Sequence, residues 1–276
     1  MSDLFLRHFE RHLEKFQRQD KKVHNSKYLY SDNAVKTYAK RLYSMAKEIG
    51  ALKEKHPREV FNGKYNLQKY VDTLPSKYSG YTVRTTCSAI NHYAKICGHQ
   101  SIKPPSVSCP SAAGYRGYAP NLIKIIEEKF QKFGEKYQVA LRFAVESGCR
   151  LEEIKTVRIA EKDLYQQKGE GYHVAVKKGE AYLSGKGGRI RPVPSACSKE
   201  TLSKALKFTG HFPKEKTLRN RLYEVLKDLG IHEKGNGFHG FRHSWARERM
   251  RDGWSRSEIS QALGHDRESI TNAYLK

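Results

Sequence analysis

The sequence predicts a mainly helical protein with a small antiparallel sheet, an α+β chain built from two domains. Its 276 residues are enough for one large domain or two of ordinary size. Apolar residues recur at helical spacing through most of the chain, and this period gives way to short alternating segments within residues 172–193. Four of the nine prolines fall within residues 101–120, among serines and glycines, a composition that resists both helix and sheet. We therefore predict a linker at residues 101–120 between an N-terminal domain, residues 1–100, and a C-terminal domain, residues 121–276.

The N-terminal domain is predicted to be a small helical bundle, because its sequence has little strand signal. Apolar side chains alternate with charged ones at helical spacing, so that each helix has one face to bury. Gly50 and Gly98 follow two of the helices as stop signals, and Pro75 stops a third. The four predicted helices span residues 3–18, 31–49, 67–74 and 81–96.

The C-terminal domain is predicted to be mostly helical with a small three-stranded antiparallel sheet. Two lysine- and glycine-containing turns separate three short segments, and we predict these segments as the strands, at residues 172–176, 181–184 and 189–193. A turn at Gly148-Cys149-Arg150 precedes a helix that begins at Leu151. The other predicted helices span residues 121–133, 137–146, 200–208, 216–228, 240–252 and 256–262, with a short helix from Glu268 onward.

The charge of the chain indicates a polyanionic partner. There are 52 Lys and Arg against 29 Asp and Glu, a formal net charge of +23, and both predicted domains contribute to the excess. Such a balance favours nucleic acid or an anionic membrane surface. No apolar run approaches the roughly 18 residues that a membrane span needs. We therefore expect DNA as the partner.

The cysteines and the N-terminus indicate a reducing compartment. Five cysteines, with no Cys-x-x-Cys pair, argue against a disulfide framework and against a zinc site. Charged residues occur close to the start of the sequence, without the apolar segment of a signal peptide. We expect a cytoplasmic protein, associated with the bacterial nucleoid. Cys149 could be a nucleophile beside Arg150, but a small, half-buried residue in a turn is the favoured interpretation.

Several groups suited to phosphodiester chemistry occur in a fixed order. Arg150 stands at a predicted helix start, and Lys186 lies in a turn between two strands. His239 and Arg242 are three residues apart, so on a helix they project from one face. His265 and Tyr274 follow, nine residues apart, at the end of the sequence. Each group alone is more often structural than reactive, but the whole ordered set on a cationic chain indicates attack on DNA phosphate.

These motifs resemble those of the tyrosine recombinase (phage integrase) family. Gly-Cys-Arg-Leu-Glu-Glu-Ile resembles the family's Gly-x-Arg-x-x-Glu box, which places Glu153 at its supporting acidic position. Ser-Gly-Lys-Gly-Gly-Arg-Ile-Arg-Pro-Val-Pro resembles its lysine hairpin, and His-Gly-Phe-Arg-His its His-x-x-Arg-His helix. Leu-Gly-His followed by tyrosine nine residues later matches its closing box. The resemblance covers residues 121–276, and residues 1–100 are similar in size and layout to its core-binding, DNA-binding domain.

The chemistry that the resemblance implies agrees with the residue types. Two guanidiniums can clamp the non-bridging oxygens of a five-coordinate phosphorus with paired planar donors, and we expect Arg150 and Arg242 in this role. Tyr274 is the expected nucleophile, and because its unperturbed pKa is near ~10, it needs cationic surroundings and a proton acceptor. His239 is the expected general base or proton manager.

The remaining members of the site have supporting or acidic roles. Lys186, whose charged form neighbouring arginines disfavour, is expected to protonate the leaving 5′ oxygen. His265 is expected to donate a hydrogen bond to the phosphate. Glu153 is expected to orient His239 or a nearby arginine. His243 points about 100° away from Arg242 on the helix, so we expect a structural or supporting role.

The predicted reaction is site-specific cleavage and rejoining of duplex DNA through a covalent 3′-phosphotyrosyl intermediate. The sequence has no carboxylate pair for magnesium and no phosphate-binding Gly-x-x-x-x-Gly-Lys-[Ser/Thr] loop, so we expect no metal and no ATP or other cofactor. The resemblance implies four protomers acting on two DNA sites, with monomers or dimers off DNA, and accessory proteins in some systems. A recombinase of mobile-element or chromosome-resolution type is expected.

Two other functions remain open from the sequence. A type IB topoisomerase would use similar active-site chemistry to relax supercoils as a monomer. A non-catalytic DNA-binding regulator could use the same scaffold. The chain also ends two residues after Tyr274, where the family commonly continues into a segment that docks on a neighbouring protomer.

Overall fold

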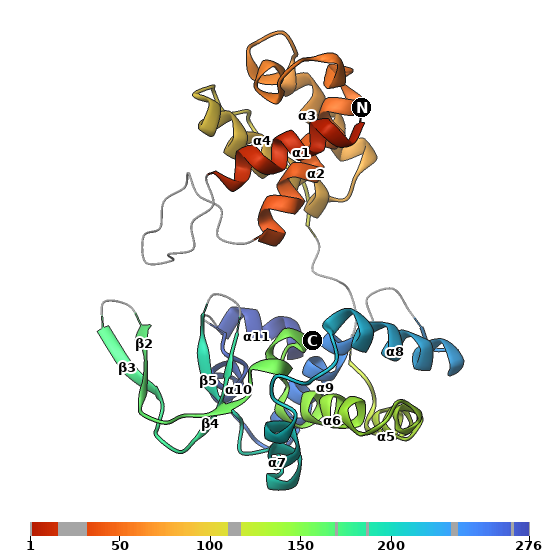
Figure 1. Ribbon diagram of the computed structural model, residues 1–276, viewed down its shortest axis with the longest axis vertical. Coiled ribbons are helices and arrows are strands. Elements are labelled where there is room, and N and C mark those ends of the chain that lie inside the picture. The colour runs from red at the N-terminus through yellow and green to blue at the C-terminus, as the bar shows by residue number, and fades with distance from the viewer. Residues whose placement is uncertain are drawn as a thin grey trace. The chain divides into compact units, whose positions relative to one another are not determined.

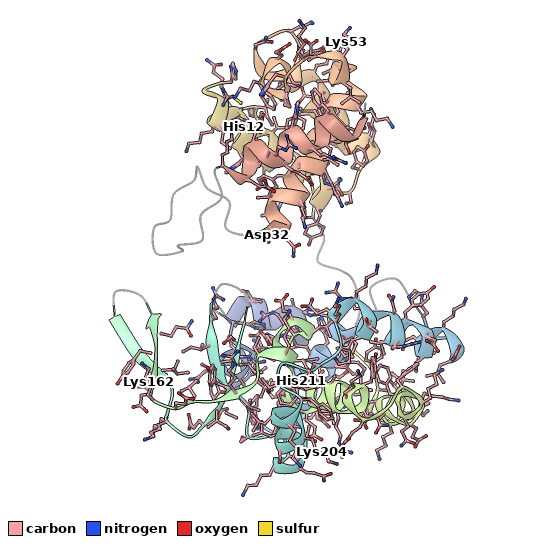
Figure 2. The ribbon with its side chains drawn as sticks, viewed as in Figure 1. His12, Asp32, Lys53, Lys162, Lys204 and His211 are labelled. Carbon is pink, nitrogen blue, oxygen red and sulfur yellow. The ribbon has the colours of Figure 1, made fainter. Side chains whose placement is uncertain are left out.

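The chain divides into two compact units, residues 1–111 and 112–276 (Figure 1). In the computed structural model the described residues are 2–15, 32–109, 117–168, 171–185, 188–232, 237–265 and 268–275. Within these ranges no helix is both long and apolar enough to cross a bilayer. Charged side chains such as Lys53 of the first unit and Lys162 and Lys204 of the second lie exposed at the surface (Figure 2).

The first unit is a helical bundle around one apolar core. Its helices are α1 (Ser2–Glu14), α2 (Asp32–Glu48), α3 (Leu67–Lys77) and α4 (Gly80–Cys97), with short 3-10 helices η1 (Ala51–Lys53) and η2 (Pro57–Phe61). Each helix turns an apolar stripe inward, so that Phe9, Leu42 and Ile90 are all fully buried. Gly98 ends α4 in a left-handed conformation with a φ of 77°.

The prediction that Pro75 stops the third helix was wrong, because α3 continues through Pro75 to Lys77. Proline lacks the amide hydrogen and disturbs the carbonyl four residues before it, but near a helix end only one turn is affected. The last turn is held by packing, by its C-cap hydrogen bond and by an ion pair. Leu74 is buried, its carbonyl accepts a hydrogen bond from the amide of Tyr78 at 2.9 Å, and Lys77 pairs with Glu48 at 3.5 Å.

Residues 101–109, the first part of the predicted linker, bind along the first unit. The side-chain amide of Asn91 exchanges two hydrogen bonds with the backbone of Ile102, and Gln68 does the same with Lys103. Gly80 permits this approach, since a Cβ there would lie 2.0 Å from the carbonyl oxygen of Ser108. Residues 110–116 lie outside the described ranges.

The second unit is mostly helical, with α6 (Glu135–Ser147) and α9 (Phe238–Arg251) packed against each other. The buried rings of Phe143 and Phe241 belong to its core, and Trp245 packs in an adjoining cluster. Helices α10 and α11 also contact α9 (Figure 1). The other described helices are α5 (Pro120–Phe130), η3 (Gln131–Phe133), η4 (Leu151–Thr156), α7 (Lys199–Lys207), α8 (Glu215–Asp228), α10 (Arg256–Leu263) and α11 (Glu268–Leu275).

The predicted three-stranded antiparallel sheet is confirmed, but one of its strands differs from the prediction. Strands β4 (Ala181–Ser184) and β5 (Ile190–Pro192) pair as expected, and the third strand is β1 (Arg158–Ile159). The predicted strand at 172–176 instead becomes β3 (Gly171–Val176), which pairs with β2 (Leu164–Lys168) in a separate hairpin. Strands β1 and β2 could not be predicted from the sequence. The two residues of β1 are too few to show a period, and β2 carries polar side chains at successive positions. Strand β3 contacts β5.

Candidate active site

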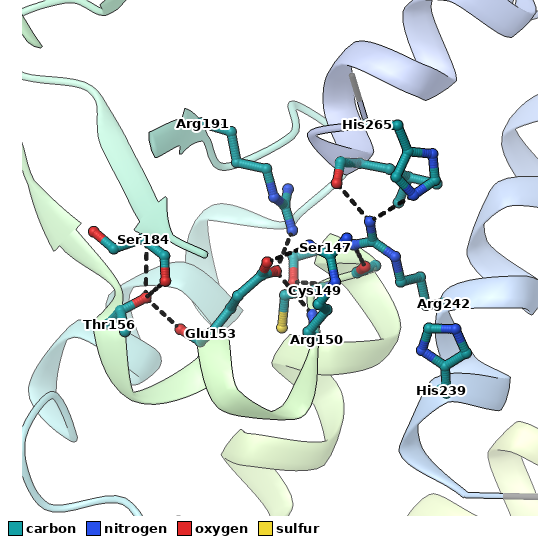
Figure 3. Close-up of polar contacts among 12 residues, drawn as sticks. Ser147, Cys149, Arg150, Glu153, Thr156, Ser184, Arg191, His239, Arg242 and His265 are labelled. Carbon is teal, nitrogen blue, oxygen red and sulfur yellow. Dashed lines mark hydrogen bonds and ion pairs between the residues drawn. The ribbon is translucent and has the colours of Figure 1, made fainter. Parts of the chain in front are cut away.

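A buried carboxylate lies at the centre of the site and binds two arginines. Glu153 is 1% exposed, and its Oε1 accepts a hydrogen bond from Nη1 of Arg150 at 2.7 Å. Its Oε2 accepts from the backbone amide of Arg150 at 2.8 Å and from Nη2 of Arg191 at 3.0 Å. Figure 3 shows Glu153 between the two guanidiniums. The carboxylate of Glu153 therefore holds Arg150 both at its backbone amide and at its guanidinium.

The charges around Glu153 keep it ionised in spite of burial. Burial alone would raise the pKa of Glu153, but the charge of Arg191, the amide of Arg150 and the charge of Arg242 together lower it to about 2. A buried carboxylate without a partner would lower the stability of the fold by several kcal/mol. The interaction of Glu153 with the arginines offsets this loss. The site keeps a net positive charge, because at least three guanidiniums act on one carboxylate.

The 3-10 helix η4 also anchors the lysine hairpin. Its last residue, Thr156, accepts a hydrogen bond from the amide of Ser184 at 2.9 Å through its hydroxyl oxygen. Gly185 then passes so close to Glu153 that a Cβ would lie 2.7 Å from Oε1. The predicted helix from Leu151 is thus a single 3-10 segment that ends where it meets β4. Lys186 itself lies outside the described residues, but its neighbour Gly185 is next to Glu153.

Arg242 is fully buried, and its guanidinium is held mainly by backbone carbonyls. Nη1 donates to the carbonyl of Gly148 at 2.8 Å, and Nη2 donates to the carbonyl of Leu263 and to Nε2 of His265, the latter at 3.0 Å. Nε has no hydrogen-bond partner among the described residues. Burial, followed by the charges of Arg191 and Arg150, lowers the pKa of Arg242 to about 10. The side chain stays charged at neutral pH.

His265 is neutral in this arrangement. Because Arg242 can only donate, Nε2 of His265 accepts, and Nδ1 carries the proton that is shared with Thr271 Oγ1 at 2.9 Å. Burial and the charge of Arg242 lower the pKa of His265 to about 3. Both ring nitrogens are therefore occupied by protein groups. The expected hydrogen bond from His265 to phosphate therefore requires a proton on Nε2 and the loss of the contact of Nε2 with Arg242.

Tyr274 lies among the histidines and Arg242. Its hydroxyl is 3.0 Å from Nε2 of His239, and its ring stacks on the ring of His243 at 4.4 Å between centroids. The ring centroid of His265 is 5.0 Å away, and Cζ of Arg242 is 5.6 Å from the tyrosine ring. His243 thus contacts the tyrosine ring directly, whereas the sequence suggested only a role pointing away from Arg242. Tyr274 is 8% exposed.

A cavity of about 520 Å³ adjoins this cluster. Arg150 and His239 line the cavity, so the cavity gives access to the site beside His239, the residue that contacts the hydroxyl of Tyr274. Its wall combines charged, polar and apolar side chains from η4, from α8 and the residues that follow it, and from the start of α9. They are Leu151, Glu152, Arg219, Asn220, Leu222, Tyr223, Leu226, His232 and Phe238.

The structure therefore brings together Arg150, Glu153, His239, Arg242, His243, His265 and Tyr274, which the sequence analysis singled out. It adds Arg191, which the motifs did not single out and which is 6% exposed. The alternation Arg189-Ile190-Arg191 on a strand was the available signal, but it does not say which arginine meets a carboxylate. Cys149 is buried, and burial raises the pKa of its thiol to about 11, which disfavours a nucleophilic thiolate. Within the described ranges, no group of three or more His, Cys, Asp or Glu side chains is placed to hold a metal ion.

One protein-family model matches the second unit of the chain. The model described as "Phage integrase family" matches residues 118–276, the part of the chain that holds every site residue named above. No curated protein sequence matches the chain.

Solved structures with a similar fold cover nearly the whole chain. A lambda integrase dimer bound to a COC′ core site is 13% identical, with a TM-score of 0.61 over 99% of this chain and 95% of that one. XerH site-specific recombinase bound to difH substrate is 15% identical, with a TM-score of 0.57 over 99% and 92%. The Tn1549 transposon integrase in complex with transposon right end DNA is 12% identical, with a TM-score of 0.52 over 97% and 94%. At these identities the likeness is one of fold.

Proposed function

Because the chain belongs to the phage integrase family of tyrosine recombinases, which are DNA breaking and rejoining enzymes, we propose that it cleaves and rejoins duplex DNA through a 3′-phosphotyrosyl intermediate. The observation that carries the proposal is the contact between the hydroxyl of Tyr274 and Nε2 of His239. This pair adjoins a cavity that Arg150 lines, and the tyrosine ring lies beside the charged guanidinium of Arg242. A phenol, a base and two cations are the groups that attack on a phosphodiester needs.

In the attack, the oxygen of Tyr274 bonds to the scissile phosphorus while the phosphorus–5′ oxygen bond breaks. His239 accepts the phenolic proton through Nε2, the atom that already faces the hydroxyl. The product is a 3′-phosphotyrosyl ester and a free 5′ hydroxyl. Rejoining is the reverse reaction with the 5′ hydroxyl of the partner strand. The ester keeps the energy of the broken bond, so the exchange needs no ATP.

The arginines stabilise the charge that builds on the non-bridging oxygens. Arg150 is 30% exposed in its side chain and lines the cavity, so it meets the incoming phosphate first. Arg242 is fully buried and its Nε has no partner among the described residues, so binding a phosphate requires Tyr274 or its helix α11 to shift and open a path to this donor. A preorganised donor of this kind is worth about 3–4 kcal/mol in the transition state.

Lys186 supplies the proton to the leaving 5′ oxygen. Its turn is anchored at Ser184 by Thr156 and at Gly185 by the close approach to Glu153, the residue that also holds Arg150. An ammonium in this cationic neighbourhood gives up its proton more readily than one in water. The leaving alkoxide is thereby neutralised as it forms.

The two units bind the DNA together in this proposal. Residues 1–100 act as the core-binding domain, residues 101–120 connect, and residues 121–276 form the catalytic domain. The net charge of +23 supports a polyanionic substrate. Lambda integrase binds a core site as a dimer and a Holliday junction as a tetramer, which supports assembly of four copies of this chain on two duplexes.

The test uses a DNA site selected from a random duplex pool by its binding to Tyr274→Phe. A nicked duplex that carries this site traps a cleaved covalent complex, because the short fragment with the 5′ hydroxyl diffuses away. Wild-type protein is expected to give a protein–DNA band that survives denaturation, whereas Tyr274→Phe binds the site and gives none. Trapping by Tyr274→Phe would show that another residue is the nucleophile. Binding without trapping by the wild type would point to a non-catalytic DNA-binding protein.

A further inference from the structure

We infer that Arg191 is a positioning residue for DNA cleavage, which sets Arg150 through Glu153 and fixes the end of helix α10 that supports Arg242. The inference rests on the proposed function of the site. Arg191 lies on β5, the second strand of the lysine hairpin. It does not reach the phosphate itself, because it is 6% exposed and both of its terminal nitrogens bind protein groups.

The first contact links Arg191 to Arg150. Nη2 of Arg191 donates to Oε2 of Glu153 at 3.0 Å, while Oε1 of the same carboxylate accepts from Nη1 of Arg150 at 2.7 Å (Figure 3). The plane of the carboxylate is therefore set by two cations at once. Without Arg191, Glu153 could rotate toward Arg150 alone and draw its guanidinium inward, away from the cavity. A displacement of ~1 Å at a catalytic group can cost about 100-fold in rate.

The second contact links Arg191 to the segment that holds Arg242. Nη1 of Arg191 donates to the carbonyl of Ala262 at 2.6 Å, next to Leu263, whose carbonyl accepts from Arg242. The turn that follows fits tightly over the Arg191 side chain. Gly264 has a φ of 66°, and a Cβ there would lie 3.0 Å from Cδ of Arg191. One side chain thus joins β5, η4 and the turn that precedes His265.

The geometry requires the guanidinium fork rather than a charge alone. The two partners of Arg191 lie on different elements, and the planar group presents separate nitrogens to each. An ammonium at this position would carry the same charge but has a single nitrogen on a shorter side chain. Arg191→Lys therefore preserves the charge around Glu153 while it breaks the bridge.

The experiment compares Arg191→Lys and Arg191→Gln with Arg158→Lys, an exposed arginine of β1 in the same sheet. Single-turnover cleavage of the nicked duplex, affinity for the uncleaved site and thermal unfolding are measured for each protein. We expect both Arg191 variants to cleave about 100-fold more slowly, with affinity within about twofold of wild type, and Arg158→Lys to cleave like wild type.

A second arm asks whether Arg191 acts through Glu153. If it does, Arg191→Lys combined with Glu153→Gln loses much less than the product of the two single losses, because residues that share one network are not additive. If the loss of cleavage rate in the double variant equals the product of the two single losses, the inference is overturned. A folded Arg191→Lys that cleaves at the wild-type rate would also overturn it. Failure of both Arg191 variants to fold would make the residue structural and would also overturn it. Absence of cleavage by the wild type would instead count against the proposed function.

Discussion

The hydroxyl of Tyr274 lies 3.0 Å from Nε2 of His239, although 35 residues separate them in the chain. The contact joins the start of α9 to α11, and the ring of His243, one helical turn after His239, stacks on the tyrosine ring at 4.4 Å. Two histidines four residues apart on one helix therefore meet the same phenol, one at its hydroxyl and one at its face. His239 is exposed and lines the cavity, so it can exchange a proton with solvent.

From this contact we predict that His239→Gln slows covalent cleavage by about 100-fold or more, because a general base typically contributes a factor of this size. Glutamine can still form a hydrogen bond with the hydroxyl but cannot take its proton. Affinity for the selected DNA site should stay close to that of the wild type. The measurement is the rate of trapping on the nicked duplex. His211→Gln, an exposed histidine of the same unit, is the matched control. A His239→Gln variant that cleaves normally would remove His239 from the mechanism.

For Lys186, the predicted defect depends on the leaving group. Lys186→Ala should cleave an ordinary phosphodiester about 100-fold more slowly. It should cleave a substrate with sulfur in place of the bridging 5′ oxygen at nearly the wild-type rate, since a thiolate leaves without a proton. Arg150→Ala should be slow on both substrates, because it stabilises the non-bridging oxygens instead. Lys162→Ala serves as the control, since Lys162 is exposed on the same unit. Equal defects of Lys186→Ala on both substrates would exclude it as the acid.

Much of the fold could be predicted because the local signals were strong. The amphipathic period of α4 and its closing glycine, Gly98, define that helix without any tertiary information. β1 could not be predicted, since a strand of two residues exists only because β4 lies beside it. The continuation of α3 through Pro75 is likewise accompanied by the burial of Leu74, which no local pattern reveals. At β1 and at the end of α3, tertiary packing therefore overrides the preference of the local sequence.

The site shows the same division between local and long-range information. Arg150, Arg242 and Tyr274 were identifiable because their motifs occur in order along the chain. Arg191 was not, since its importance depends on β5 lying against η4 and the end of α10, two segments distant in sequence. The neutral state of His265 was hidden for a similar reason. It follows from burial beside Arg242, which no local pattern around Leu263-Gly264-His265 reveals.

The lowered pKa of His265 predicts a dependence of stability on pH. Burial and the charge of Arg242 lower this pKa to about 3 in the folded protein, against about 6.5 in an unfolded chain. The unfolded state therefore binds a proton first as the pH falls. The contribution of the neutral ring is complete above about pH 6.5 and declines below it, by at most about 1.4 kcal/mol per pH unit, until the folded pKa is reached.

This dependence can be measured by unfolding the wild type and His265→Gln in denaturant between pH 7 and pH 4. The variant should lose less stability on acidification, although it starts from a less stable state at pH 7. His12 of the first unit also has a lowered pKa, about 4, through burial and the charge of Arg58, so the first unit should weaken in acid in both proteins. A probe in the second unit, such as the fluorescence of Trp245 and Trp254, separates the two effects. Parallel curves for wild type and variant would contradict a neutral, buried His265.

A requirement for two DNA sites separates a recombinase from a type IB topoisomerase, whose chemistry would be the same. A recombinase needs two copies of its site, because the 5′ hydroxyl released at one duplex attacks the phosphotyrosine formed at the other. A supercoiled plasmid with two selected sites should therefore give exchanged products, and a plasmid with one site should give no intramolecular exchange. Tyr274→Phe controls for nuclease contamination in both reactions. Rapid relaxation of a plasmid that lacks the site, without exchanged products from the two-site plasmid, would identify a topoisomerase that acts as a single copy.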